Sequence, residues 1–157
     1  DFMDIYLGAK CRFFICGDAG LTLVPETFRL PIVYANLTHW AQLSTWSHNG
    51  LSIGKKFYLS GENRFLTFRE IINSELGYIY DGKLLKQKGV ELIENTPEEI
   101  AAVTIEMDER LKGTWKTTQE DEELQRHFWE IYGSDKLKSP DYRIGTDFVR
   151  QNRELLK

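Results

Sequence analysis

The chain has 157 residues, of which 41% are apolar and 28% charged, a composition that suits one folded domain with a hydrophobic core rather than a disordered segment. The net charge of -4 argues against a general nucleic-acid binder, which would be basic. No apolar run is long enough to span a membrane and no signal peptide is visible, so a cytoplasmic protein is expected.

The first part of the chain predicts a βαβ unit. Its elements are a helix over 2–10, a strand over 12–16 (RFFIC), a tight turn over 17–20 (GDAG), a helix over 21–29 and a strand over 32–35. Pro25 falls near the first turn of the second helix, Pro31 ends that helix, and the last strand ends at Asn36. Parallel strands joined in this way imply helices on both faces of a sheet.

The rest of the chain adds further elements. They are an irregular stretch over 37–54, strands over 56–59 and 90–94, and helices over 67–76, 97–112, 119–132 and 143–155. Thr67 with Glu70, and Thr96 with Glu99, predict capping boxes for two of these helices, and Gly113 predicts the end of one.

The expected fold class is therefore α/β, with a Rossmann-like parallel sheet and flanking helices. We expect a single domain over 1–157, with C-terminal helices over about 118–157. Three or four predicted strands fall short of the roughly five or six of a doubly wound sheet. We therefore expect further strands upstream of Asp1, which makes this chain a fragment of a longer protein.

The two cysteines predict neither a disulfide nor a metal site. Cys11 directly precedes the predicted strand over 12–16 and Cys16 ends it; in extended chain this odd separation points the two side chains to opposite faces. No His or Cys with metal-binding spacing surrounds them, and no Asp-x-Asp motif occurs. We expect two reduced, mostly buried thiols, and neither a metal nor a cofactor.

The GDAG turn is the most informative candidate for a ligand-binding site. A glycine turn after a parallel strand lets a ligand approach the backbone, and the first amides of the following helix would point outward at the positive end of its dipole. Such a corner suits a phosphate or diphosphate, although many α/β folds have one for structural reasons alone.

Several segments together resemble a family of glycosyltransferases from bacterial surface-polysaccharide loci. They are DFMDIYLGAKCRFFICGDAGL, LPIVYAN, NRFLTFREI, GVELIENTPEEI, EMDERLKGTW and RIGTDFVRQNRELL, in the same order over nearly the whole chain. The resemblance implies the C-terminal, donor-binding domain of a GT-B fold. Its donor diphosphate would lie against Gly17, Asp18, Ala19, Gly20, Leu21 and Thr22, with Lys55 pairing to a phosphate.

Four further residues are weaker candidates for contacts to the nucleoside or sugar: Asn36, His39, Trp40 and Glu26. Glu26 is displaced by two positions from the spacing of the family's ribose-binding glutamate, which Val24 occupies. Asp18 and Ala19 replace expected hydroxyl residues, and Asp18 would repel a diphosphate unless it caps the helix or another group intervenes. Trp40 and Trp46 could equally anchor their own loop.

Three functions stay open at this level. The first is a transferase that uses a nucleotide-sugar donor and a glycan or lipid-linked acceptor, with catalytic residues unknown and an inverting base expected in an N-terminal GT-B domain or a partner chain. The second is a non-catalytic half of a split transferase or an assembly module, and the third is a sugar-nucleotide epimerase. Peripheral association with the inner membrane is compatible with the first.

Overall fold

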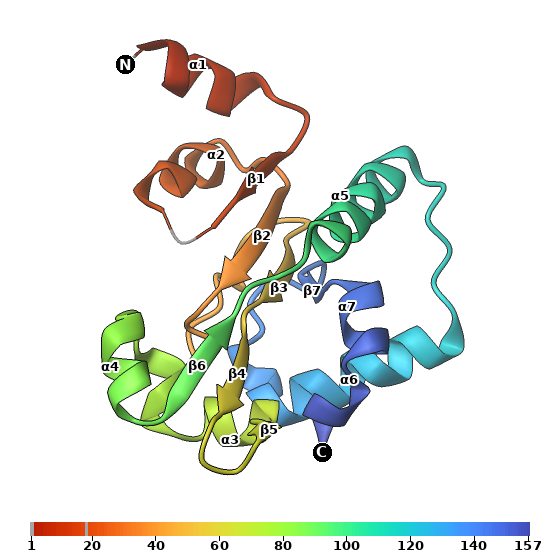
Figure 1. The fold of residues 1–157 in the computed structure, drawn as a ribbon. Coiled ribbons are helices and arrows are strands. Elements are labelled where there is room, and N and C mark those ends of the chain that lie inside the picture. Colours follow the sequence, from red (N-terminus) through yellow and green to blue (C-terminus); the bar gives the residue numbers. More distant parts are fainter. Residues whose placement is uncertain (1, 18) are drawn as a thin grey trace.

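The computed structural model describes residues 2–17 and 19–157, which form an α/β fold around a four-stranded parallel sheet flanked by helices (Figure 1). The strand order is β1-β2-β3-β7, with bounds β1 Phe14–Cys16, β2 Ile32–Leu37, β3 Leu51–Gly54 and β7 Arg143–Ile144. A second, antiparallel sheet has the order β5-β4-β6, with bounds β4 Lys56–Leu59, β5 Arg64–Phe65 and β6 Val90–Ile93. This architecture is compatible with the predicted Rossmann-like class.

The helices are α1 Phe2–Lys10, α2 Leu23–Thr27, α3 Phe68–Ile72, α4 Gly82–Gln87, α5 Pro97–Lys112, α6 Gln119–Tyr132 and α7 Thr146–Gln151. Short 3-10 turns cover Gly20–Thr22, Glu75–Tyr78, Ser134–Lys136 and Arg153–Leu156. Both predicted capping boxes form, at Thr67 and at Thr96, and Gly113 ends α5 in the left-handed conformation. Within the described ranges, no helix has the length and apolarity needed to cross a bilayer.

Three predictions that concern the strands were wrong. Residues 51–54 were expected to be irregular, but they form β3, which is paired on both sides by β2 and β7. Residues 143–144 were expected to be helical, but they form β7. The strands over 56–59 and 90–94 exist, yet they pair antiparallel with each other and do not extend the parallel sheet. In all three cases the structure depends on pairing with segments that are distant in sequence. The pattern of neighbouring residues does not reveal such pairing.

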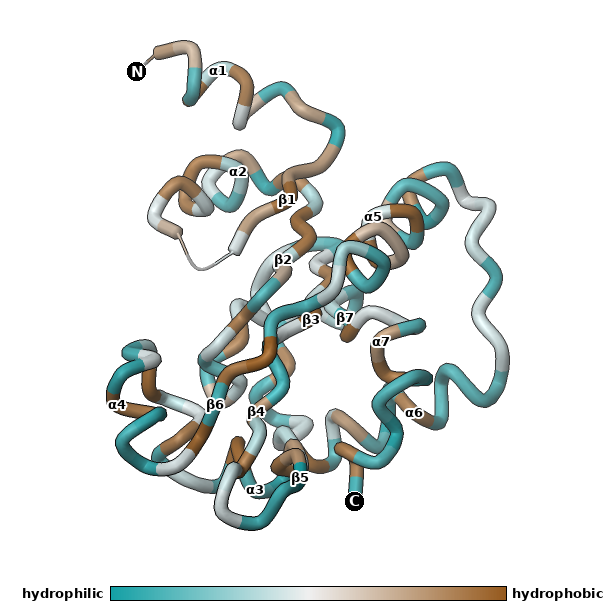
Figure 2. The backbone as a smooth tube through the Cα atoms, in the orientation of Figure 1, coloured by the Kyte–Doolittle hydropathy of each residue, from teal (hydrophilic) through white to brown (hydrophobic). Residues whose placement is uncertain are grey.

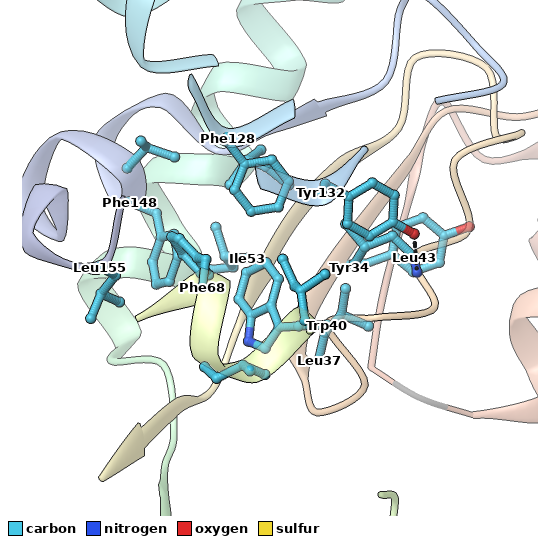
Figure 3. Packing of buried hydrophobic residues seen from close by; sticks show 14 of the residues in the cluster. Tyr34, Leu37, Trp40, Leu43, Ile53, Phe68, Phe128, Tyr132, Phe148 and Leu155 are labelled. Carbon is cyan, nitrogen blue, oxygen red and sulfur yellow. Dashed lines mark hydrogen bonds between the residues drawn. The ribbon is translucent and has the colours of Figure 1, made fainter. Parts of the chain in front are cut away.

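An aromatic cluster centred on Trp40 forms the middle of the core (Figure 3). The Trp40 side chain is fully buried, and its ring centroid lies 4.9 Å from that of Phe68 and 6.0 Å from that of Phe128. Its indole N–H donates to the carbonyl of Lys55 at 3.0 Å. Gly54 is required beneath it, since an added Cβ would lie 2.5 Å from the indole ring. This cluster holds the carboxyl ends of β2 and β3 in place.

The N-terminal elements carry an exposed apolar surface. Helix α1 packs against α2, where Gly8 meets Val24, but most of its large apolar side chains face outward. Figure 2 shows hydrophobic stretches along both helices. The exposed apolar residues of this surface are Phe2, Met3, Ile5, Tyr6, Leu7, Leu21, Leu23 and Phe28. Many exposed large apolar side chains on neighbouring elements are typical of a region that binds another protein surface or a membrane.

Candidate functional site

A cleft of about 360 Å³ opens at the carboxyl ends of β1 and β2. Its lining residues come from the turn after β1, from the 3-10 turn and α2, from β2, and from the segments after β2 and before α4. They are Gly17, Ala19, Gly20, Thr22, Leu23, Glu26, Tyr34, Leu37, His39, Ser44, Trp46 and Tyr80. Open α/β sheets bind ligands at this edge, where the loops that follow the strands can be shaped without disturbing the sheet.

Gly17, Ala19 and Gly20 of the turn after β1 line this cleft, but the amides of the turn are less available than expected. The amide of Ala19 donates to the carbonyl of Gly17 at 3.0 Å, and that of Thr22 donates to the carbonyl of Ala19 at 3.1 Å. The Thr22 hydroxyl also donates to Ala19. The predicted helix over 21–29 is in fact a 3-10 turn followed by the five-residue α2, so a strong helix dipole does not develop here.

A hydrogen-bonded chain fixes the polar side of the cleft. The Tyr34 hydroxyl donates to Glu26 Oε1 at 2.7 Å and lies 2.7 Å from the Ser47 hydroxyl. Burial is the main cause that raises the pKa of Tyr34 above its usual range, so the phenol stays protonated and keeps donating. Glu26 thus has a fixed carboxylate with further lone pairs for another donor.

Aromatic rings form the other side. The His39 ring stacks on Tyr80 with centroids 4.5 Å apart, and the Tyr80 hydroxyl donates to Gln42 at 3.0 Å. Trp46 is 61% exposed, an unusual state for a tryptophan, and its ring lines the cleft without being packed into the core. Exposed aromatic faces beside a concave polar surface suit stacking on a planar base or on the apolar face of a sugar.

The structure brings together part of the predicted set of site residues. Gly17, Ala19, Gly20, Thr22, Glu26 and His39 all line the cleft. Leu21 is exposed and does not line it, and Trp40 belongs to the core. Asp18, predicted at the centre of the turn, lies outside the described residues.

Asn36 and Lys55 are engaged in contacts between the two sheets. The amide of Asn36 donates to Asn95 Oδ1 at 2.8 Å, and the amide of Asn95 donates back to Asn36 Oδ1 at 2.7 Å. The left-handed φ of 57° at Asn36 allows this reciprocal pair. The Lys55 ammonium lies 3.0 Å from Glu94 Oε1 and does not line the cleft. Both residues therefore have structural partners at the positions where ligand contacts were predicted.

Sequence reasoning missed several residues of the cleft, chiefly Tyr34, Ser44 and Tyr80. Tyr34 was part of the predicted strand over 32–35, and Tyr80 is far from the turn in sequence, so no local signal linked either residue to the turn. Arg29 lines an adjoining pocket that shares Glu26 and Trp46 with the cleft. Among the described lining residues of the cleft itself there is no lysine or arginine.

The chain's ionisable groups do not form a metal centre in the described ranges, where no group of three or more His, Cys, Asp or Glu side chains is placed to hold an ion. Neither Cys11 nor Cys16 forms a disulfide among the described residues, both are half-buried, and Cys11 lies outside β1. Comparison with protein-family models, with curated proteins and with solved structures finds no match to this chain.

Proposed function

We propose that this chain is the donor-binding, C-terminal part of a GT-B glycosyltransferase that acts in surface-polysaccharide synthesis. The observation that carries the proposal is the cleft at the carboxyl ends of β1 and β2, which the glycine turn, Glu26 and three aromatic rings line together. A nucleotide-sugar has the matching parts: a planar base, a ribose diol, a diphosphate and a sugar. The geometry favours a nucleotide over a small ion because apolar and aromatic surface makes up much of the lining.

In this proposal, Glu26 and the aromatic side of the cleft bind the nucleoside. A carboxylate at the wall of such a cleft accepts hydrogen bonds from vicinal ribose hydroxyls, and Tyr34 holds this one in place. Trp46, or the His39–Tyr80 pair, offers a face for the base. The assignment of Glu26 to ribose is consistent with the family resemblance despite the shift of two positions.

The diphosphate would lie against the turn at Gly17 and Gly20. Gly20 has no heavy atom within 4 Å of where its Cβ would be, so the backbone there is open to a ligand. Because Ala19 and Thr22 use their amides within the turn, charge neutralisation needs a further cation. Arg29, in the adjoining pocket, is the residue of this chain that we assign to it.

The exposed apolar surface of α1 and α2 favours a second form of the same proposal, in which this chain works with another protein unit. An N-terminal GT-B domain or a partner chain would cover that surface and supply the acceptor site and the catalytic base. A glycan or lipid-linked acceptor would then bind between the two units, and a peripheral membrane position would suit a lipid-linked one.

Binding of UDP and GDP, measured by calorimetry on the chain and on two glycine variants, tests the proposal. Gly20→Ala adds a methyl group to open space at the turn, so the fold is unaffected while a bound diphosphate is pushed away. Gly61→Ala is the matched control, because its Cβ would also meet no atom within 4 Å but lies in the β4–β5 turn. We expect one nucleotide to bind, Gly20→Ala to weaken it about tenfold or more, and Gly61→Ala to leave it unchanged.

Equal affinities of wild type and Gly20→Ala would contradict the assignment of the turn, and absence of binding by either nucleotide would contradict the donor site. Incubation with a labelled nucleotide-sugar then separates the activities. Transfer to an acceptor only when a second polypeptide is present supports the split form. Conversion of the sugar without any acceptor identifies an epimerase and overturns the transferase.

A further inference from the structure

A second cavity, of about 320 Å³, lies at the opposite edge of the parallel sheet from the cleft. Leu51 and Arg143, which begin β3 and β7, line it together with Arg110 near the end of α5 and Trp115 in the connection from α5 to α6. Asn49, Met107, Gly113, Thr117, Pro140 and Asp141 complete the lining. None of these residues lines the cleft at the carboxyl ends of the strands, so the two sites can be tested independently.

Besides Arg110 Nη2, two buried N–H donors of this cavity have no acceptor among the described residues: Trp115 Nε1 and Arg143 Nε. The other two nitrogens of Arg143 donate to Glu122, at 2.8 and 3.3 Å, which fixes the plane of the guanidinium. Leaving a buried donor without an acceptor is costly, and folded proteins rarely do so. Two such donors in the lining of one cavity call for acceptor atoms inside it.

Two of the residues that line the cavity are arginines, whose guanidinium groups are well suited to an oxyanion as the source of those acceptors. Arg110 Nε donates to Glu106 Oε1 at 2.8 Å, and its Nη2 lies 2.8 Å from the same oxygen without hydrogen-bonding geometry. The Arg110 guanidinium also lies 5.4 Å from the centroid of the Trp115 ring, which orients that indole.

The nearby carboxylates do not fill the role of the missing acceptor. Glu106 is committed to Arg110 and to both the amide and the hydroxyl of Thr146, and Glu122 is committed to Arg143. Asp141 also lines the cavity, but its side chain is half-exposed and lies 3.5 Å from His48 Nδ1. An acceptor-rich ligand can therefore pair with Trp115 and Arg143 without displacing an existing pair of either arginine, once neighbouring side chains move aside from the two nitrogens, which each have less than 1 Å² of accessible surface.

We propose that this cavity binds a tetrahedral oxyanion, a phosphate group, through Arg143 Nε and Trp115 Nε1, with Arg110 contributing positive charge. Phosphate oxygens accept several hydrogen bonds at once from donors that approach from different directions, and here the donors come from β7 and from the segment after α5. The cavity is larger than one phosphate ion, so it has room for either inorganic phosphate or the phosphate group of a monoester.

The test follows the indole N–H signal of Trp115 in ¹⁵N-labelled full-length chain by NMR, with Trp115→Phe used to assign the signal. Inorganic phosphate and glycerol phosphate are added in separate titrations at constant ionic strength, with chloride as the reference salt. We expect a saturable shift of this signal with phosphate and none with chloride. Tighter binding of glycerol phosphate would identify the ligand as a monoester, and tighter binding of inorganic phosphate would identify the free ion.

Substitutions at two arginines give the matched comparison. Arg143→Lys keeps the positive charge facing Glu122 but lacks the Nε donor, so we expect at least about fivefold weaker phosphate binding. Arg126→Gln changes an exposed arginine that pairs with Glu130 on α6, and it should leave binding unchanged. If Arg143→Lys does not fold, calorimetry of Trp115→Phe with phosphate replaces it, with the same expected loss.

Three results would overturn the proposal: a Trp115 signal that phosphate does not move, a shift that chloride reproduces at equal ionic strength, or unchanged affinity in the Arg143 or Trp115 variant. Because the readout is one indole at the far edge of the sheet, phosphate binding at the glycine turn would not imitate a positive result.

Discussion

The hydroxyl of Tyr34 donates a 2.7 Å hydrogen bond to Glu26 Oε1 and thereby joins β2 to α2 across the wall of the cleft. This bond links a residue of the predicted strand over 32–35 to Glu26, the glutamate that the resemblance associates with ribose despite its shift of two positions. It explains how a carboxylate on a five-residue helix can be held in a fixed orientation. The role of Glu26 is therefore open to a direct test.

Glu26→Gln should weaken binding of UDP or GDP about five- to tenfold and leave the fold unchanged. The amide oxygen of glutamine can still accept from Tyr34, whereas the charge-assisted hydrogen bonds to ribose hydroxyls are lost. Calorimetric titration measures the change. Glu98→Gln is the control, because Glu98 is an exposed residue in the first turn of α5 and does not line the cleft. Equal losses of nucleotide affinity in both variants would show that Glu26 does not contact the nucleotide.

Replacing Trp46 and Trp40 by alanine should have opposite consequences for binding and stability. Trp46→Ala removes an exposed ring from the cleft, so we expect a loss of about 1–3 kcal/mol in nucleotide binding if the ring stacks on a base, and a change in the free energy of unfolding within about 0.5 kcal/mol. Trp40→Ala empties the centre of the core and should lower the free energy of unfolding by about 3–5 kcal/mol.

Urea unfolding and calorimetry measure the two quantities on the same samples. A Trp46→Ala variant that binds as well as wild type would show that its ring is not a stacking surface. A Trp40→Ala variant of normal stability would contradict the packing in Figure 3.

The buried carboxylate of Asp121 should make stability depend on acid pH. Burial alone would raise its pKa, but hydrogen bonds from Arg150, at 2.7 Å, and from the amide of Thr118, at 2.8 Å, outweigh that effect and lower the pKa from 3.8 to about 2. Because the folded-state pKa lies below the unfolded value, this stabilisation is fully present above about pH 4 and is lost as the pH falls towards 2.

The shift corresponds to about 2 kcal/mol in the free energy of unfolding. Asp121→Asn should therefore be less stable than wild type near neutral pH, and the difference should shrink as the pH falls through this window. Arg150 keeps a second partner, Asp147 at 2.8 Å, so no unpaired cation is created. Urea unfolding at several pH values measures the difference, with Glu120→Gln, an exposed partner of Arg153, as the control. A difference that does not change with pH would contradict the assignment.

Sequence patterns predicted the elements that are determined locally. The capping boxes at Thr67 and Thr96 and the amphipathic helix α6 are each encoded within a few consecutive residues. Strands β3 and β7 could not be found in this way. β3 contains a buried serine and ends in a glycine required by Trp40, and β7 has only two residues. Both strands form because they pair with adjacent strands, not because their own residues favour a strand.

The candidate site was predictable to the same degree. The glycine turn could be located because strand, turn and helix follow one another in sequence, and the structure places most of its described residues in a cleft. The remaining cleft residues, such as Tyr34 and Tyr80, depend on tertiary packing. Lys55 and Asn36 occupy the expected edge, but Glu94 and Asn95, which approach from beyond β6, take up their polar groups. Competition of this kind cannot be inferred from spacing.

The central claim is that a nucleotide occupies the cleft at the carboxyl ends of β1 and β2. An NMR titration of the full-length protein with UDP and with GDP tests it most directly, following the backbone amides of residues 17–22 and the indole signal of Trp46. We expect that one nucleotide shifts both groups of signals along a single saturation curve. Saturating amounts of either nucleotide that leave the turn amides and the Trp46 indole unmoved would contradict it.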